Sequence, residues 1–470
     1  MVFSEPFFLF IFLPLALLLI NLSRGRGHNY AILFFSLAFY YWSSGLAVLL
    51  LLFSIIGNWG FGLLIARYRT RAVLATGIVL NLCTIGFFKY AYFFAENASL
   101  AIAYEGDNPF ANVILPIGIS FFTFQGVSYL IDIWRKEIDA EKNPVIFGAY
   151  LSFFPQLIAG PIVRFKHVIS DYRKPKVSMD NMAFGLSRFA HGLIKKVLIA
   201  DSAGLVADAC FSVPVAQLSA AEAWLGAFAY AVQIYFDFSA YSDMAIGLGL
   251  VCGVRFLENF NHPYTSSSIT EFWRRWHISL STWFRDYLYI PLGGNRVGKI
   301  ATYRNLLIVF FITGLWHGAS WSFVVWGLYH GLFLIGEKLV LGKRIGSLRS
   351  PLLRLVYVLP VVLIGWVIFR ADSLPLAISY LGVMFNPFAH DLAGLSKSVQ
   401  EALTPFTVFA LLLGSSAFFA SRRNTLGITL TTRAGPAMDF ARLVYVTFAI
   451  SFGTILVLRS EFSPFLYFRF

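Results

Sequence analysis

His317 is the residue of this sequence best suited to do chemistry. It lies in the stretch TGLWHGA (313–319), between two apolar runs and far from any Lys. A neutral imidazole can accept a proton from a hydroxyl near working pH. Gly314, Gly318 and Ala319 are small enough to let another backbone or a substrate come close. We therefore predict a general base at His317, the alternative being a structural histidine bonded to a neighbouring carbonyl.

A second cluster, WRRWH (273–277), combines tryptophans and arginines with His277. We predict that His277 orients a substrate or polarises a carbonyl. Arg274 and Arg275 fit phosphates, either those of lipids or those of an acyl donor. Interfacial anchoring is the favoured alternative for the two arginines.

Two carboxylates occupy a third apolar stretch, QIYFDFSAYSD (233–243). At about 100° per residue, Asp237 and Asp243 fall on different faces of one helix. A paired-carboxylate site is therefore not expected. Hydrogen bonding to Arg or to backbone amides of neighbouring helices is the favoured role.

Two further histidines, His330 and His191, are less suited to this site. One straight helix would separate His330 from His317 by about 20 Å, so the two can share a site only if the chain turns back near Gly318. His191, followed by Lys195 and Lys196, is typical of a helix end at a cytoplasmic face.

Several classes of site have no motif here. The sequence contains no G-x-S-x-G elbow, P-loop or HExxH, and no GxGxxG in a strand context, which argues against a serine hydrolase or a nucleotide-driven pump. Its cysteines, Cys83, Cys210 and Cys252, lie in apolar runs without metal-ligand spacing. We predict buried thiols and no metal site.

The composition places these residues in a membrane protein. Hydrophobic residues make up 58% of the 470-residue chain and charged residues 13%, against about 45–50% and 25% in soluble domains. The net charge of +13 fits Lys and Arg held in cytoplasmic loops. Nucleic-acid binding is not expected, since no such module is present.

Apolar runs long enough to span a bilayer, about 17–25 residues, follow one another along the chain and predict an all-α polytopic protein of about 11–12 spans. Basic and non-basic loops alternate, which places both termini outside the cytoplasm. The predicted spans are 5–22, 29–46, 47–66, 72–95, 112–134, 183–211, 223–252, 303–318, 319–340, 352–370, 403–420 and 441–458.

Two segments depart from this pattern. Residues 146–163 are apolar but flanked by basic loops on both sides, which predicts a re-entrant hairpin broken by Pro155, Gly160 and Pro161. A short interfacial helix is the alternative. Residues 262–296 are too polar to face lipid and too aromatic for a free linker. We predict that they form helices packed at the cytoplasmic face and dipping into the protein.

The sequence resembles the membrane-bound O-acyltransferase family, and within it the bacterial alginate O-acetyltransferase type. The resemblance covers most of the chain in the family's order. The stretches that carry it are PIGISFFTFQGVSYLID (116–132), FFPQLIAGPIVR (153–164), QIYFDFSAYSDMAIG (233–247), FWRRWHISLSTWFRDYLYIPLGG (272–294), GLWHGASWSFVVWGLYHG (314–331) and SPFLYFRF (463–470).

The resemblance implies a helical bundle around a funnel or tunnel through the bacterial inner membrane. His317 matches the family's near-invariant histidine, and His277 its second polar position, often Asn, Asp or His. The donor, acetyl-CoA or another acyl thioester, is expected from the cytoplasm, and the acceptor or a relay protein from the periplasm. The donor-binding residues are unassigned, with Arg274, Arg275 and Trp316 as candidates.

The sequence thus predicts one membrane domain over 1–470, with a core at about 112–370, peripheral spans over 1–95 and C-terminal spans over 403–470. The favoured activity is O-acetylation of an exported polysaccharide, with alginate first and cellulose and peptidoglycan behind it. The alternatives are D-alanyl transfer to teichoic acid, an acyl-group transporter without chemistry, and a scaffold for a polymer-export complex.

Overall fold

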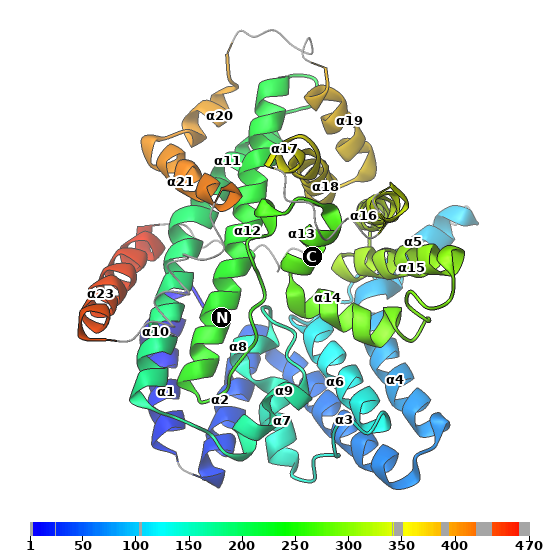
Figure 1. The fold of residues 1–470 in the computed structure, drawn as a ribbon, viewed down its shortest axis with the longest axis vertical. Coiled ribbons are helices and arrows are strands. Elements are labelled where there is room, and N and C mark those ends of the chain that lie inside the picture. The colour runs from blue at the N-terminus through cyan, green and yellow to red at the C-terminus, as the bar shows by residue number, and fades with distance from the viewer. Residues whose placement is uncertain are drawn as a thin grey trace. The chain divides into compact units, whose positions relative to one another are not determined.

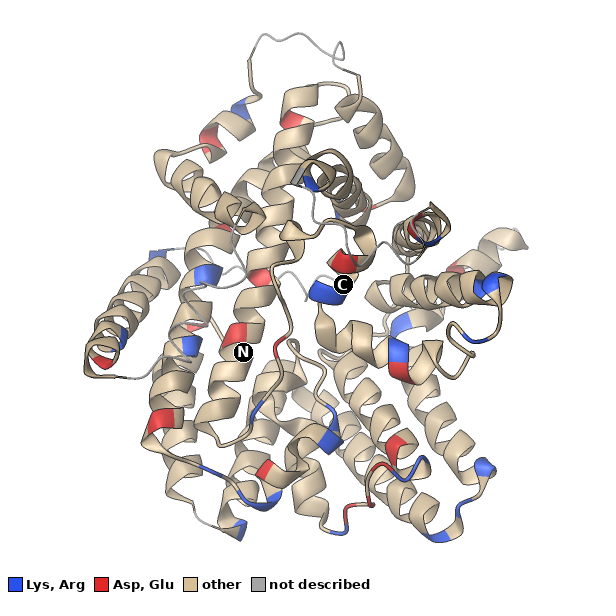
Figure 2. Ribbon diagram, in the orientation of Figure 1, with Lys and Arg blue, Asp and Glu red and all other residues tan. Residues whose placement is uncertain are grey.

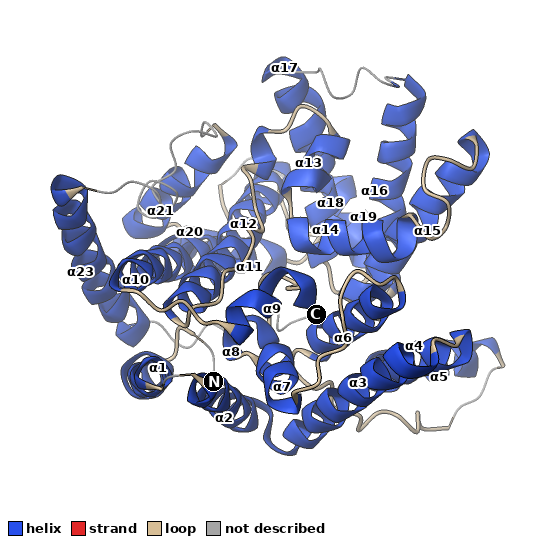
Figure 3. Cartoon of the chain, turned by 60° about the horizontal axis from the view of Figure 1, so that its bottom comes forward, coloured by secondary structure: helices blue, strands red, loops and turns tan. Residues whose placement is uncertain are grey.

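A computed structural model describes residues 3–23, 25–102, 106–340, 342, 351–386, 394–419 and 435–459. These residues form helices joined by loops, and none of them lies in a strand (Figures 1 and 3). The predicted all-α architecture is therefore confirmed. The chain divides into two compact units, unit 1 with residues 1–189 and 242–258 and unit 2 with residues 190–241 and 259–470. The single membrane domain stays a prediction, and the 463–470 stretch lies outside the described residues.

Unit 1 is built mainly from the first third of the chain. Its helices are η1 (Phe8–Phe12), α1 (Leu13–Leu22), α2 (Arg26–Ser44), η2 (Gly45–Ala47), α3 (Val48–Tyr68), α4 (Arg71–Ile85), η3 (Gly86–Tyr90), α5 (Ala91–Ala101), α6 (Ile119–Trp134), α7 (Pro144–Ser152), α8 (Phe154–Leu157) and α9 (Phe165–Arg173). Two further helices, α10 (Met179–Ile194) and α12 (Ala220–Val251), have residues in both units.

The predicted break within 146–163 is present in unit 1. Helix α7 ends at Ser152, the four-residue α8 follows, and the chain from Ile158 to Arg164 is not helical. The first interruption falls at Phe153, two residues before Pro155. The segment is buried, and Tyr150 donates a hydrogen bond of 2.9 Å to the Val163 carbonyl. This irregular backbone is thus packed inside protein, as membrane depth would require.

Unit 2 contains the His-bearing stretches. Its helices are η4 (Lys195–Ala200), α11 (Asp201–Ser212), η5 (Pro263–Thr265), α13 (Ile269–Arg275), α14 (Ile278–Phe284), η6 (Arg285–Tyr289), α15 (Lys299–His317), α16 (Trp321–Val340), α17 (Pro351–Leu353), η8 (Arg354–Val358), α18 (Leu359–Arg370), α19 (Leu374–Met384), α20 (Lys397–Ala402), α21 (Pro405–Ser415), η9 (Ser416–Phe418) and α23 (Pro436–Arg459). The short helices over 262–296 confirm the helical prediction for that segment.

Helices α15 and α16 form an antiparallel pair whose backbones touch. A Cβ atom on Gly314 would lie 2.3 Å from the Phe323 carbonyl oxygen, and one on Gly327 would lie 2.2 Å from that of Phe310. Only glycine permits such an approach, since there is no side chain to separate the helices. The predicted close approach at Gly314 is confirmed, and its partner is the following helix.

This contact gives a testable expectation for stability. We expect Gly327→Ala to destabilise the protein by about 1–3 kcal/mol, because the added methyl group meets backbone that cannot move aside. The matched control is Gly336→Ala in the same helix, where nothing lies within 4 Å of the new atom. Thermal unfolding in detergent would compare the two. Equal melting temperatures would show that the helices are not in contact at Gly327.

The two carboxylates of α12 have separate cationic partners. In unit 1, Asp243 accepts from Arg188 at 2.7 Å, which confirms the predicted bonding to Arg. In unit 2, Asp237 accepts from Lys196 at 2.6 Å, and Asp201 pairs with the same ammonium group at 2.7 Å. As predicted, Asp237 and Asp243 do not form a carboxylate pair.

The predicted helix end after His191 is wrong. Helix α10 continues through the π-helical turn η4 into α11, and Lys196 is buried rather than facing a loop. Asp237 and Asp201 neutralise its charge, so a lysine here does not mark the edge of an apolar helix. His191 instead lies 2.8 Å from the Tyr445 hydroxyl.

Among the described residues, four helical stretches are long and apolar enough to cross a membrane. These are Arg26–Tyr68, Arg71–Ala101, Trp321–Val340 and Pro436–Arg459. Basic residues Arg67, Arg69 and Arg71 lie at the turn joining α3 to α4, where Figure 2 shows Lys and Arg in blue. Basic residues at the end of an apolar helix are typical of a multi-pass membrane protein.

Candidate active site

His317 is the last residue of α15, where the chain leaves the helix and turns back into α16. Its ring packs edge-on against Trp326 of α16 and Phe369 of α18, with centroids 5.0 and 5.1 Å away. The residue keeps 9% of its surface accessible, whereas His277 and His330 each keep 1%. Of these three histidines, His317 is therefore the most accessible to a substrate.

The chain turns back after Gly318, which is the condition under which His330 can share a site with His317. Its ring lies 5.3 Å from Trp326, the same indole that contacts His317, and 5.0 Å from Trp273. A Cβ atom on Gly365 would lie 2.7 Å from its Nε2 atom, so α18 is packed directly against this imidazole. His330 thus lines the aromatic cluster around His317, a placement that sequence spacing alone did not settle.

This cluster contains ring nitrogens without hydrogen-bond partners. Within the described part of the chain, Nε1 of Trp273, Nε1 of Trp326 and Nδ1 of His330 are buried and make no hydrogen bond. An unpaired buried donor or acceptor costs about 1–3 kcal/mol. Groups of this kind are rare in folded proteins, and a bound polar ligand or water would satisfy them.

His277 is positioned by the turn between α13 and α14. It adopts a left-handed backbone conformation with φ of 43°, which costs a non-glycine residue about 1–2 kcal/mol. Its ring packs against Phe238 at 4.7 Å and lies 6.2 Å from Trp316, the residue before His317. The Trp316 indole also contacts the His317 ring at 4.7 Å. The two predicted site histidines thus both lie near the same indole.

Helix α13, which leads into His277, is anchored at its N-terminus. At its start, the Glu337 carboxylate of α16 accepts hydrogen bonds from the backbone N–H groups of Ile269 and Thr270, at 2.5 and 2.8 Å. A carboxylate at a helix N-terminus satisfies free N–H groups and favours the helix dipole. The charge pattern of the sequence did not reveal this cap, because Glu337 lies far along the chain.

The two arginines of the WRRWH cluster differ in their surroundings. Arg275 is buried, pairs with Glu271 and donates to the Thr265 hydroxyl at 2.9 Å. Its guanidinium group is therefore engaged within its own segment. Arg274 is exposed and makes no ion pair with any described residue. Of the two, Arg274 keeps its donors available for a phosphate.

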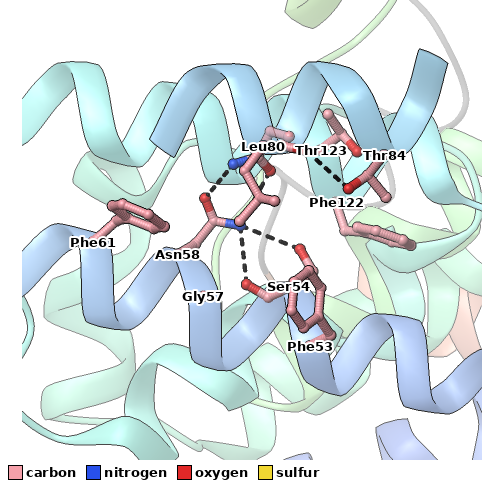
Figure 4. Close-up of a pocket in the computed structure, with 10 residues that line it drawn as sticks. Phe53, Ser54, Gly57, Asn58, Phe61, Leu80, Thr84, Phe122 and Thr123 are labelled. Carbon is pink, nitrogen blue, oxygen red and sulfur yellow. Dashed lines mark hydrogen bonds between the residues drawn. The ribbon is translucent and has the colours of Figure 1, made fainter. Parts of the chain in front are cut away.

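Unit 1 contains a small cavity, whereas the site histidines belong to unit 2. The cavity lies among α3, α4 and α6, where Asn58 and Asn81 exchange hydrogen bonds of 2.9 and 3.2 Å (Figure 4). Asn58 also donates to the Ser54 carbonyl at 2.9 Å. Paired amides of this kind hold helices together inside a membrane.

Comparison with known proteins identifies the family. The model of the membrane-bound O-acyltransferase family matches residues 63–343, which include both site histidines. A probable alginate O-acetylase of Azotobacter vinelandii is 41% identical, with all of each chain covered. A probable alginate O-acetylase of Pseudomonas aeruginosa is 45% identical over 90% of this chain and 82% of that protein.

Two further relatives bear on the alternatives that the sequence left open. A peptidoglycan O-acetyltransferase of Helicobacter pylori is 33% identical over 100% of this chain and 98% of that protein. A teichoic acid D-alanyltransferase of Bacillus subtilis is 29% identical over only 48% of this chain and 60% of that protein. Acetyl transfer is therefore favoured over D-alanyl transfer. The chain belongs to the membrane-bound O-acyltransferase family and is a multi-pass membrane enzyme that transfers acyl groups to oxygen.

Proposed function

We propose that this enzyme acetylates alginate during its export, using an acetyl thioester from the cytoplasm. Acetyl-CoA or another acyl thioester supplies the acetyl group, and the polymer or a periplasmic relay protein receives it. The enzyme lies in the bacterial inner membrane with both termini in the periplasm. The observation that carries the catalytic part is His317, which keeps 9% of its surface accessible at a helix end and packs against Trp326, whose buried Nε1 makes no hydrogen bond with any described residue.

The chemistry follows from the properties of a neutral imidazole. His317 takes the proton of the acceptor hydroxyl as the oxygen attacks the thioester carbonyl carbon. The carbon–oxygen bond forms, the carbon–sulfur bond breaks, and the imidazolium returns its proton to the departing thiolate. The products are an acetyl ester and a free thiol, so atoms and charge balance without a metal or redox partner.

The identity of the acceptor rests on similarity. The two alginate O-acetylases are 41% and 45% identical to this chain, and the peptidoglycan O-acetyltransferase is 33% identical. This difference favours alginate and keeps peptidoglycan as the second candidate. Arg274 is the side chain we assign to the donor's phosphates, because Arg275 is held by Glu271.

The test is complementation in an alginate-producing bacterium that lacks its own membrane O-acetylase. We expect expression of this chain to restore acetyl esters on secreted alginate, measured by proton NMR of the purified polymer. Mass analysis of cell-wall fragments from the same culture checks the second candidate. Unacetylated alginate together with newly acetylated peptidoglycan would contradict the proposed acceptor. D-alanyl esters in place of acetyl esters would contradict the proposed donor group.

A further inference from the structure

The hydrogen bonds of Asn259 define which atom of His277 carries a proton. The backbone N–H of Ser279 points at Oδ1 of Asn259 at 3.2 Å, and the Ser279 hydroxyl lies 2.9 Å from the same atom. A backbone N–H is always a donor, so the side-chain atom facing it is the amide oxygen and not the nitrogen. This fixes the orientation of the Asn259 amide group.

The imidazole of His277 faces the same oxygen. Its Nδ1 atom lies 3.2 Å from Oδ1 of Asn259. The Ser279 hydroxyl also lies 3.4 Å from this Nδ1 atom, but its hydrogen is donated to Oδ1 of Asn259 at the shorter distance of 2.9 Å. An amide oxygen only accepts hydrogen bonds, so Nδ1 is a donor to it and carries hydrogen. The bond between these two side chains therefore selects the Nδ1–H tautomer, in the way that a second residue orients a catalytic histidine in other enzymes.

The opposite ring nitrogen is left with a free lone pair. His277 is 1% exposed, and its Nε2 atom makes no hydrogen bond with any described residue. A second proton on the ring would create a buried cation with no acceptor for Nε2–H, which is costly in an apolar environment. The ring is therefore neutral, with Nδ1 as donor and Nε2 as acceptor.

The backbone holds this arrangement in place. The Asn261 N–H donates to the Arg275 carbonyl at 3.0 Å, and the Ile278 N–H donates to the Asn259 carbonyl at 2.9 Å. These two bonds clamp the segment containing Asn259 against the turn that carries His277. The left-handed φ of His277 persists because the surrounding structure determines it, a form of strain often found at functional sites.

We propose that Asn259 is a positioning residue that makes Nε2 of His277 a hydrogen-bond acceptor for a bound reactant. This inference rests on the proposed acetyl transfer and names the contact that His277 makes in it. The reactant must present a donor, either the acceptor's hydroxyl group or an amide N–H on the carrier chain of the thioester. A neutral His277 with this tautomer does not stabilise an oxyanion, because that role needs a hydrogen on Nε2.

The experiment compares three variants in membranes that contain the export machinery, with labelled acetyl thioester and polymer as reactants. Asn259→Leu removes the oxygen at similar volume, and Asn259→Asp keeps an oxygen toward Nδ1. Thr282→Val is the matched control, because it removes a nearby hydroxyl of α14 that donates to the Ser279 carbonyl at 3.0 Å and leaves the Asn259–His277 bond. Size-exclusion chromatography and thermal unfolding establish that each variant is folded before its kcat and KM are compared.

We expect Asn259→Leu to lower kcat/KM about 10-fold to 100-fold, the size of effect seen when a residue that orients a histidine is removed. Asn259→Asp should recover most of that loss, and Thr282→Val should stay near wild type. A raised KM for the thioester identifies the donor's amide as the reactant group, and a raised KM for the polymer identifies the hydroxyl.

Two results would overturn the inference. One is a folded Asn259→Leu enzyme with wild-type kcat/KM. The other is an equal loss in all three variants, which would reduce Asn259 to packing. Both are distinct from failure of the proposed function, in which the wild-type enzyme itself transfers no acetyl groups to alginate.

Discussion

We expect replacement of His317 by Ala to abolish acetyl transfer while the protein remains folded in the membrane. The imidazole lies at the end of α15, and its removal leaves the backbone contact between Gly314 and Gly327 intact. The hydroxyl nucleophile then has no base at the reacting centre, and general-base catalysis alone contributes about 10²–10⁴-fold. We therefore expect polymer acetylation to fall to the background of cells without the enzyme.

The measurement is the acetyl content of alginate from cells that carry equal amounts of folded wild-type or variant protein. Val325→Ala serves as the control for helix packing, since it shortens a half-buried apolar side chain of α16. That control should keep wild-type acetylation. If His317→Ala acetylated the polymer to the wild-type level, His317 would be a structural residue and the proposed mechanism would be wrong.

Loss of the buried lysine is expected to have the largest effect on stability. Lys196 and Asp237 have side chains only 2% and 4% exposed, and Asp201 shares the same ammonium group. Replacement of Lys196 by Met leaves two carboxylates without their cation. Breaking a buried pair in this way costs about 3–5 kcal/mol. We expect a large fall in melting temperature and in membrane yield.

The adjacent lysine supplies a matched control. Lys195 lies over the ring of Phe236 at 5.8 Å, a contact worth about 0.5–1 kcal/mol at an accessible site. Lys195→Met should therefore cost much less than Lys196→Met, and Asp237→Asn added to Lys196→Met should restore part of the stability. If the two single variants unfolded at the same temperature, the Lys196–Asp237 pair would not be a buried ion pair.

Local sequence signals predicted most of the helices and the close approach at Gly314. Long apolar runs left few alternatives to helix in the membrane, and the small residues around His317 indicated where backbones would meet. Helix α19 was missed because its short apolar run lies in a stretch of chain that, with few basic residues, was interpreted as a loop. The helix end predicted after His191 is wrong because the carboxylates that neutralise Lys196 come partly from another helix.

In the site, too, local sequence signals identified some residues, whereas others are placed by contacts between segments that are distant in the sequence. His317 and His277 stood out by their residue types and flanking glycine, tryptophan and arginine residues. Asn259 did not, because nothing in its own surroundings distinguishes it from any other polar loop residue. Its role follows from two hydrogen bonds made across a turn. His330 likewise became part of the aromatic cluster only through the reversal between α15 and α16.

The proposed reaction requires that reactants reach His317 from both sides of the membrane. The prediction of three buried thiols is wrong for Cys83, which is exposed, and holds for Cys210 and Cys252. Two-sided access is therefore tested most directly by chemical labelling of His317→Cys in a Cys83→Ser background. A small charged thiosulfonate is added to intact cells or to inverted membrane vesicles, and its incorporation is measured by mass spectrometry. We predict labelling from both faces, above that of the same background with His317 retained. If the thiol at residue 317 reacted only after unfolding and was labelled from neither face, two-sided access to this position would be contradicted.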